Sequence, residues 1–375
     1  MRNIALRLTT AVIAASFLLT TPAQAAGKVY LGRVGALSSK IKEKVESSNA
    51  TLTKFFEEIN RKGGIHGNQI ELVFGDDGFD SNRHVEETKR IIAKHQPIAF
   101  IGSSGSGGPQ ELIKQGILAE ARIPLIAPIT GAIPLRNDPY IFPIRASWVD
   151  ELQKLSQQVQ ALGHQRVAVL YQNDSDGKFG VFAARQEFKK LNMDLVATAA
   201  YDRNTMDVAP AVKTLLEAQP TAILLAGVQE ALAEFLKQYR LAGGTAQMYT
   251  ISVVDAQELI QVAGINAARG TGISQVLPFI FADSTPISKE YRAFAKRNKL
   301  NIGYTEFEFY IAGKLVAEAL RKAGSEPTGE KLIKALESLD NFNVGGYRLS
   351  FAPDRHAGSK FVEVTVIGQS GQLVR

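Results

Sequence analysis

The chain of 375 residues contains no cysteine, which excludes disulfides, thiol nucleophiles and cysteine-based metal sites. It also excludes a lipid-modified cysteine at a cleavage point, so we expect a product that is not anchored to a membrane. No stretch beyond the N-terminal region reaches the roughly 20 apolar residues of a membrane-spanning helix. Histidines are few, dispersed and without metal-ligand spacing, which predicts surface positions for His66, His84, His95, His164 and His356.

The first 25 residues predict a cleaved secretory signal peptide. Arg2 and Arg7 give a positive start, Ala11–Leu19 is a short apolar stretch, and Ala23-Gln24-Ala25 is a cleavage signal. The apolar stretch is too short to span a membrane. We therefore expect residues 1–25 to be removed and the protein to be exported to the periplasm.

Basic and acidic residues are nearly balanced, with 43 Lys and Arg against 37 Asp and Glu. The basic residues are scattered, and no basic stripe with interleaved aromatic residues is present. This pattern does not favour a nucleic-acid partner. The length is sufficient for two domains, each with its own core.

Apolar strand-like runs alternate with amphipathic helical patterns along most of the chain. Strands are predicted at 29–37, 69–76, 97–102, 124–128, 166–172, 194–201, 221–227, 247–252, 347–352 and 360–368, and helices include 110–121, 179–191, 288–298, 306–323 and 328–338. Continuous apolar strands between helices indicate parallel sheets that are buried on both faces. One set ends near Pro128 and a second spans about 150–252, which predicts an α/β protein of two doubly wound lobes. Residues 139–148 and 272–279 are the expected crossings between them.

The stretch FIGSSGSGGPQE, residues 100–111, is a loop of Gly and Ser between a strand and a helix. It fails as a phosphate loop because Gly108 stands where the lysine is required, and as a dinucleotide fingerprint because position 110 is Gln110. Neither serine has the flanking glycines of a nucleophile elbow. A calcium loop at 173–177 fails because Ala183 occupies the closing position. No catalytic pattern is found, which favours a binding protein.

The same loop suits a small carboxylate. Loops at the carboxyl edge of a parallel sheet bind ligands in α/β proteins, and the N–H groups that begin a helix attract anions. Glycine lets a carboxylate approach the backbone, and Ser104 and Ser106 add hydroxyl donors. A flexible turn without a ligand is the alternative, and the loop alone does not decide between them.

Several segments, in this order and spacing, resemble those of the periplasmic solute-binding component of ABC importers of the branched-chain amino acid (Leu/Ile/Val) type. They are INRKGGIHGNQIELVFGDD (59–77), AFIGSSGSG (99–107), ARIPLIAPITGA (121–132), YIFPIRAS (140–147), VAVLYQNDSDGKFG (167–180) and YRLAGG (239–244). The resemblance implies the type I periplasmic binding protein fold, with two Rossmann-like lobes joined by a three-stranded hinge around a ligand cleft. Lobe 1 would be 27–145 plus 277–343, and lobe 2 would be 147–275 plus 346–375. It also implies a monomer that needs no cofactor or metal.

The resemblance further implies positions for the ligand. The carboxylate-binding serine of the family falls at or near Ser106, beside Gly107, and Ser104 lies in the same loop. A second donor segment falls on Thr130 and Gly131. An aromatic residue that lines the pocket from lobe 2 falls on Phe179.

The chain departs from the family pattern where the ligand's ammonium group is held. The family's acidic residue aligns with Ser252, and the nearest acid is Asp255, while a family aromatic aligns with Val228. Either Asp255 substitutes or the ligand is not an α-amino acid, because an unpaired buried ammonium costs roughly several kcal/mol. Trp148, the single tryptophan, either stacks on the ligand or packs the hinge. Arg145 either contacts a carboxylate or braces the crossing segment.

We therefore expect a periplasmic protein that captures a small polar solute, an amino acid or a related carboxylate or amide, and delivers it to membrane permease subunits. A ligand sensor for a membrane receptor kinase is the alternative among binding proteins. A secreted α/β hydrolase is the alternative among enzymes, and it requires a histidine within hydrogen-bond reach of a serine in the cleft.

Overall fold

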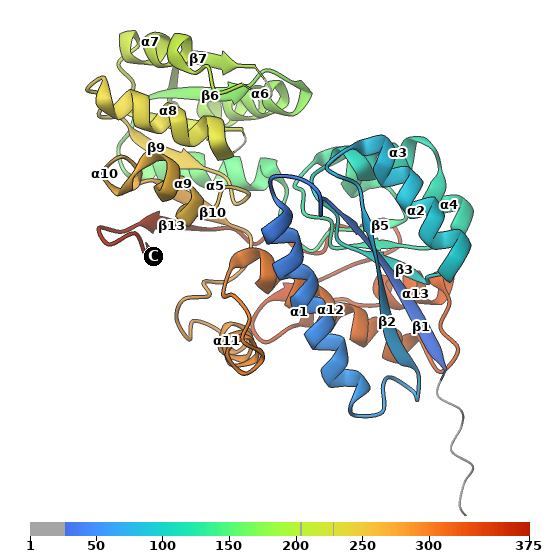
Figure 1. Cartoon of the computed structure of the whole chain (residues 1–375). Coiled ribbons are helices and arrows are strands. Elements are labelled where there is room, and N and C mark those ends of the chain that lie inside the picture. The colour runs from blue at the N-terminus through green and yellow to red at the C-terminus, as the bar shows by residue number, and fades with distance from the viewer. Residues whose placement is uncertain (1–26, 203–204, 228) are drawn as a thin grey trace, which may run out of the picture.

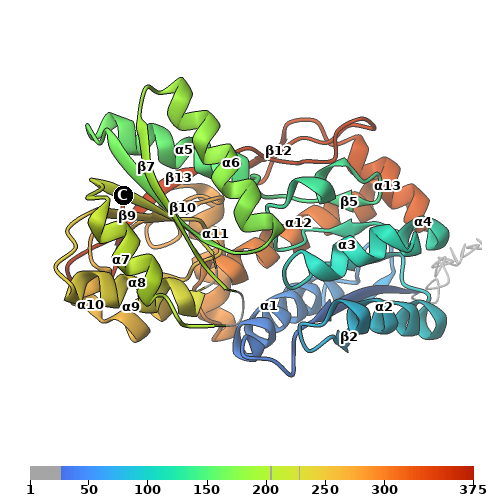
Figure 2. The same ribbon diagram turned by 90° about the horizontal axis from the view of Figure 1, so that it is seen from above.

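The computed structural model of the chain describes residues 27–202, 205–227 and 229–375. The predicted signal peptide, residues 1–25, lies outside this part. The described chain forms two α/β lobes (Figure 1), and the view from above also separates them (Figure 2). The blue N-terminal elements and the orange helices near the C-terminus share one lobe, and the green and yellow elements form the other.

The sheet of the first lobe has five parallel strands in the order β2-β1-β3-β4-β5. They are β1 (Lys28–Gly35), β2 (Gln69–Asp76), β3 (Ala99–Ile101), β4 (Leu125–Ile126) and β5 (Ile141–Phe142). The chain goes outward from β1 to β2 and then returns to the other side of β1. The order therefore reverses between β1 and β3, and ligands of doubly wound sheets bind at such a point.

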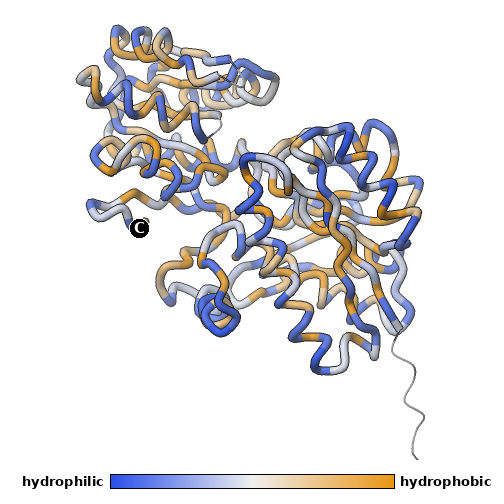
Figure 3. The backbone as a smooth tube through the Cα atoms, in the orientation of Figure 1, coloured by the Kyte–Doolittle hydropathy of each residue, from blue (hydrophilic) through white to orange (hydrophobic). Residues whose placement is uncertain are grey.

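Helices cover both faces of this sheet. They are α1 (Lys42–Asn60), α2 (Ser81–His95), α3 (Gly107–Lys114), α4 (Ile117–Ala121), α11 (Pro286–Asn298), α12 (Tyr304–Ala323) and α13 (Gly329–Glu337). Leu31 and Ile101 pack toward α1 and α12, whereas Val34 and Phe100 pack toward α2 and α3. This alternation explains why the strands are largely apolar, and Figure 3 shows orange segments inside the lobe and blue along much of the helix surface.

The predicted helix at 110–121 is two helices. Gly116 has a φ of 68° and ends the first of them, because a left-handed residue cannot continue an α-helix. Helix α3 also begins earlier than predicted, at Gly107, and has Pro109 in its first turn.

The second lobe contains a seven-stranded sheet in the order β14-β13-β10-β9-β8-β6-β7. Its strands are β6 (Arg166–Gln172), β7 (Asp194–Tyr201), β8 (Ala222–Ala226), β9 (Gln247–Thr250), β10 (Gly272–Gln275), β13 (Glu363–Ile367) and β14 (Leu373–Val374). The first five in chain order are parallel and repeat the order of the first lobe, with the reversal between β6 and β8. β13 and β14 are antiparallel additions at the edge.

Two groups of helices cover this second sheet. Helices α5 (Trp148–Ala161) and α6 (Ser175–Lys190) pack on one face. On the other face lie α7 (Ala209–Glu217), α8 (Gln229–Leu241), α9 (Ala256–Ala263) and α10 (Ile265–Ala268). The predicted fold class, two doubly wound α/β lobes, is confirmed.

Three crossing segments lie side by side between the lobes. The Tyr347 hydroxyl donates to the carbonyl oxygens of Ile144 at 2.5 Å and Val276 at 3.2 Å. The Gly358 N–H donates to the Pro143 carbonyl oxygen at 2.9 Å. Residues near 144, 276 and 358 therefore form the expected three-stranded hinge.

The segment that begins at residue 346 differs from the prediction. Strand β12 (Arg348–Leu349) pairs with β11 (Phe342–Asn343) and not with the second sheet. Leu349 and Phe351 are buried in the core of the first lobe, where the Phe351 ring packs 5.7 Å from that of Phe142. Of the residues after 346, β13 and β14 join the second sheet. The other predicted lobe boundaries stay predictions.

Candidate functional site

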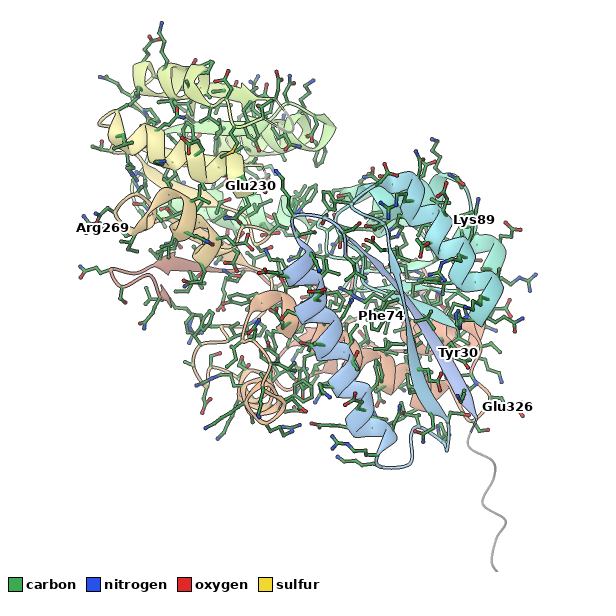
Figure 4. All side chains as sticks on the ribbon, viewed as in Figure 1. Tyr30, Phe74, Lys89, Glu230, Arg269 and Glu326 are labelled. Atoms are coloured by element: carbon green, nitrogen blue, oxygen red, sulfur yellow. The ribbon has the colours of Figure 1, made fainter. Side chains whose placement is uncertain are left out.

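The carboxyl edges of the two sheets face one another. The Lys44 ammonium group, near the start of α1, lies 3.1 Å from the Glu258 carboxylate, near the start of α9. Each helix follows directly on a parallel strand, β1 or β9, so both begin at the carboxyl edge of their sheet. Glu230, labelled in Figure 4, lies at the end of α8 nearest the first lobe. The loops after β1 to β4 therefore face those after β6 to β9.

Ser106 and Thr130 meet at the carboxyl edge of the first sheet. Their hydroxyl oxygens are 2.9 Å apart, although the residues come from the loops after β3 and β4. Ser106 is the N-cap residue of α3, but its side chain does not cap the helix. The first N–H groups of α3 therefore have no side-chain acceptor, and the helix dipole favours an anion there.

Ser104 joins the loops on both sides of the strand reversal. Its hydroxyl accepts from the Ala36 N–H at 3.4 Å, and its backbone pairs with Ile129. The loops after β1, β3 and β4 are thus linked at the point where a doubly wound sheet binds ligands. The structure brings Ser104, Ser106 and Thr130 together, and their role in binding a ligand stays a prediction.

Both Gly107 and Gly131 lie in close contact with neighbouring side chains. A Cβ on Gly107 would lie 2.5 Å from the Ser81 hydroxyl oxygen, and one on Gly131 would lie 2.4 Å from Cδ1 of Trp148. The Trp148 N–H donates to the Gly131 carbonyl oxygen at 3.0 Å. The Trp148 side chain packs against buried residues of both lobes. Its contacts are those of a hinge-packing residue, and stacking on a ligand stays a prediction.

Phe179 lies in the first part of α6, after β6, and its side chain is 43% exposed. Phe79 is a second exposed aromatic residue, which the sequence analysis did not single out. It follows β2, is 54% exposed, and adopts a left-handed backbone with a φ of 69°. A Cβ on Gly105 would lie 3.4 Å from its ring, so Phe79 borders the Gly-Ser loop.

A buried Asp77–His84 pair supports this border of the loop. The Asp77 carboxylate accepts from the Phe79 N–H at 2.8 Å and lies 2.7 Å from Nδ1 of His84. Both members of the pair are buried. The predicted surface position of His84 is therefore wrong, and that of His356 is also wrong, because its ring stacks on Phe142 at 4.0 Å.

Asp255 serves as the N-cap of α9. Its carboxylate accepts from the N–H groups of Gln257 at 2.8 Å and Glu258 at 3.1 Å. Ser252 stands at the position of the family's acid. Its hydroxyl oxygen accepts a hydrogen bond from Nη2 of Arg145 at 3.2 Å. Glu230 is an acid near the facing edges that the sequence analysis missed. Val228 lies outside the described residues.

A buried charged cluster fills the junction between the lobes. Nε of Arg145 lies 3.4 Å from the Glu308 carboxylate of α12. The Glu151 carboxylate accepts from the Ser252 N–H at 2.7 Å and the Ser274 hydroxyl at 2.6 Å. Arg145 thus contacts both lobes, which is the bracing role in the sequence analysis. Burial raises the pKa of Glu308 to about 7 and also raises the pKa of Glu151, although Arg145 opposes both shifts.

Glu308→Gln is expected to flatten the pH dependence of stability. Because the pKa of Glu308 rises from 4.5 to about 7 on folding, the folded protein binds more protons between these values, so its stability falls as the pH rises through this window. Removing the titrating group should decrease this fall by about 3 kcal/mol. Urea unfolding at several pH values measures the effect, with exposed Glu326→Gln (Figure 4) as the control. Parallel curves for wild type and Glu308→Gln would contradict the assignment.

The hydrolase alternative requires a histidine beside a serine of the site. The two buried histidines instead contact carboxylates, His84 that of Asp77 and His356 that of Glu337 at 3.1 Å. Within residues 27–202, 205–227 and 229–375, no cluster of side chains suits a metal ion. Across the same ranges, no helix combines the length and apolar character needed to cross a membrane. A groove of about 450 Å³ lies elsewhere, among α1, α11 and α12, and none of the predicted site residues lines it.

Comparisons with known proteins agree with this geometry. The periplasmic binding protein family matches residues 28–372. "Leu/Ile/Val-binding protein homolog 7" of Brucella melitensis is 26% identical over 363 residues, which cover 89% of this chain and 88% of the relative. The crystal structure of a substrate-binding periplasmic protein from Ralstonia solanacearum is 33% identical, with a TM-score of 0.85, covering 92% of this chain and 99% of that one.

A branched-chain amino acid ABC transporter protein from Thermus thermophilus, solved with bound valine, shares the fold at 19% identity. Its TM-score is 0.81, over 94% of this chain and 96% of that one. The match to the family spans nearly the whole described chain, and nothing in these comparisons supports a hydrolase. The chain therefore belongs to the periplasmic binding protein family, whose members bind substrates and are not enzymes.

Proposed function

We propose that this protein captures a small carboxylate-bearing solute between its lobes and delivers it to the membrane permease subunits of an ABC importer. The observation that carries the proposal is the start of α3. It has no side-chain cap, it lies beside the Ser106–Thr130 pair, and it faces the second lobe. Export through a cleaved signal peptide at residues 1–25 and a monomeric state are part of the same proposal.

The first lobe supplies the polar contacts in this proposal. The N–H groups at Gly107 and Gly131 and the hydroxyls of Ser104, Ser106 and Thr130 receive the carboxylate. All of these residues lie in the loops after β3 and β4, except Gly107, which begins α3. Short hydroxyl groups and main-chain donors bind a carboxylate through charge-assisted hydrogen bonds.

The second lobe and the rim supply apolar contacts. Phe179, and Phe79 from the first lobe, are exposed at edges that face each other, so an apolar part of the ligand would cover them. Trp148 lies beside Gly131 and would report on the site. Asp255 and Glu230 are the two acids proposed for a ligand ammonium group. This composition suits an amino acid or a related carboxylate with an apolar side chain.

Binding would act by shifting the population toward a closed state. A ligand that contacts both lobes binds that state more tightly and so favours it. The three hinge segments and the Lys44–Glu258 pair are the contacts that such a motion would alter.

Thermal-shift screening of the mature protein tests the proposal. The panel contains amino acids, their amides, and alkyl and aryl carboxylates. A carboxylate at 100 times its Kd should stabilise the folded state by about 2.7 kcal/mol. The fluorescence of Trp148 is expected to change in the same titration. Stabilisation by amides alone would contradict a carboxylate site.

A further inference from the structure

Arg33 is a buried cation in the middle of the first lobe. It lies in β1, is 2% exposed, and makes only neutral contacts. Its Nη2 donates to the Ser48 hydroxyl oxygen at 2.7 Å and its Nε donates to the Asn49 side-chain oxygen. Its guanidinium group lies 3.9 Å from the centre of the Phe309 ring.

No ion pair joins Arg33 to a carboxylate in the described part of the chain. Asp77 is the acid whose charge acts on Arg33, but it makes no hydrogen bond to the guanidinium group, and its carboxylate instead lies 2.7 Å from Nδ1 of His84. Burial lowers the pKa of Arg33 to about 9, so the side chain stays charged at neutral pH. Arg145, the other buried arginine near the lobes' junction, has Glu308 as a partner. A buried charge without a carboxylate in direct contact is costly, which makes Arg33 unusual.

The charge of Arg33 lies directly behind the Gly-Ser loop. Its Nη1 donates to the Ile101 carbonyl oxygen at 3.4 Å, at the end of β3. Gly102 begins the loop with a φ of 70°, and a Cβ there would lie 2.3 Å from the same Nη1. The loop then leads to Ser104 and to the uncapped start of α3. A fixed positive charge therefore lies at the base of the loop that leads to this helix N-terminus.

We infer that Arg33 is a positioning residue for an anionic ligand: it holds the Gly-Ser loop from behind, and its buried charge is balanced by the ligand's carboxylate. The inference rests on the proposed function. It accounts for a cation that is kept in the core of the lobe without a direct ion pair to an acid. It also accounts for an anion site that has no arginine or lysine among its proposed contact residues.

The test compares matched carboxylates and amides on wild type, Arg33→Met and Arg33→Lys. The probes are leucine with leucinamide, and 4-methylpentanoate with 4-methylpentanamide. Calorimetric titration of the mature protein gives the ratio of amide Kd to carboxylate Kd. In Arg33→Met this ratio should fall by about tenfold or more, as expected for a unit charge acting through protein at close range. Arg33→Lys should retain most of the ratio because it keeps the charge.

The ratio separates an electrostatic role from a structural one. Arg33→Lys keeps the charge but loses the planar contacts of the guanidinium group, so damage to the loop would lower the ratio in both variants, which would overturn the inference, whereas loss of the charge alone lowers it only in Arg33→Met. Circular dichroism of each variant checks the fold. If Arg33→Met does not fold, Arg33→Lys supplies the answer, because a folded Arg33→Lys protein that no longer prefers the carboxylate would also overturn the inference. A wild type that prefers the carboxylate in neither pair overturns the proposed carboxylate site and this inference together. If wild type prefers the carboxylate and Arg33→Met has the same ratio of amide Kd to carboxylate Kd, the inference is overturned and the proposed carboxylate site stands.

Discussion

Ser106→Leu is expected to weaken carboxylate binding by about a thousandfold while the protein keeps its fold. Ser106 lies at the N-cap of α3 with its hydroxyl oxygen 2.9 Å from that of Thr130. A leucine there would occupy the space in front of the N–H groups of α3 and remove a hydroxyl donor. Two or three charge-assisted hydrogen bonds would be lost, each contributing about 1.5–3 kcal/mol. At about 1.4 kcal/mol for each factor of ten, the loss reaches three orders of magnitude.

Two further variants separate the causes of this loss. Ser106→Ala removes the hydroxyl and leaves the backbone donors, so its affinity should fall by only about tenfold. Ser325→Leu makes the same substitution at an exposed position between α12 and α13, and it should bind as wild type does. Affinity is measured by calorimetric titration and the fold by thermal unfolding. Wild-type affinity in a folded Ser106→Leu protein would show that the carboxylate lies elsewhere.

The apolar runs between amphipathic helices predicted the two sheets, because helices cover both faces of each sheet. Leu31 and Phe100 point to opposite faces and are both buried, so apolar residues occur on both sides of the strands. The same property explains the wrong placement of the segment after residue 346. Leu349 and Phe351 have the pattern of a strand, but that pattern does not specify which core they enter. That choice depends on Phe142, which lies some two hundred residues away in the chain.

The Gly-Ser loop could be found from the sequence because glycine, serine and a following helix form a local pattern. The roles of neighbouring residues could not, because they depend on contacts between distant segments. Arg33 interrupts an apolar strand, and only the fold shows that Ser48, Asn49 and Phe309 surround it. Asp255 was a candidate for a ligand contact, and it is also a helix cap, which the sequence analysis did not identify.

Arg145→Met is expected to lower the free energy of unfolding by about 3–5 kcal/mol at pH 7. Arg145 is the cation of the buried cluster that contacts Glu308, and it also donates to Ser252 in the other lobe. Without it, the carboxyl groups of Glu308 and Glu151 lose the positive charge that opposes the rise of their pKa values. Methionine keeps much of the volume, so the loss reports the charge rather than a cavity. Urea unfolding followed by circular dichroism measures it.

The position of the charge decides the size of this effect. Arg292→Met removes an arginine that lies 2.9 Å from Asp283, but both side chains of that pair are exposed, so its stability should change by less than about 1 kcal/mol. The double variant Arg145→Met/Glu308→Gln removes both members of the buried pair and should recover part of the loss, because glutamine, unlike a buried carboxyl group without its arginine, needs no proton from solution on folding at pH 7. A double variant less stable than Arg145→Met alone would mean that packing at the hinge, and not charge balance, determines the stability of the junction between the lobes.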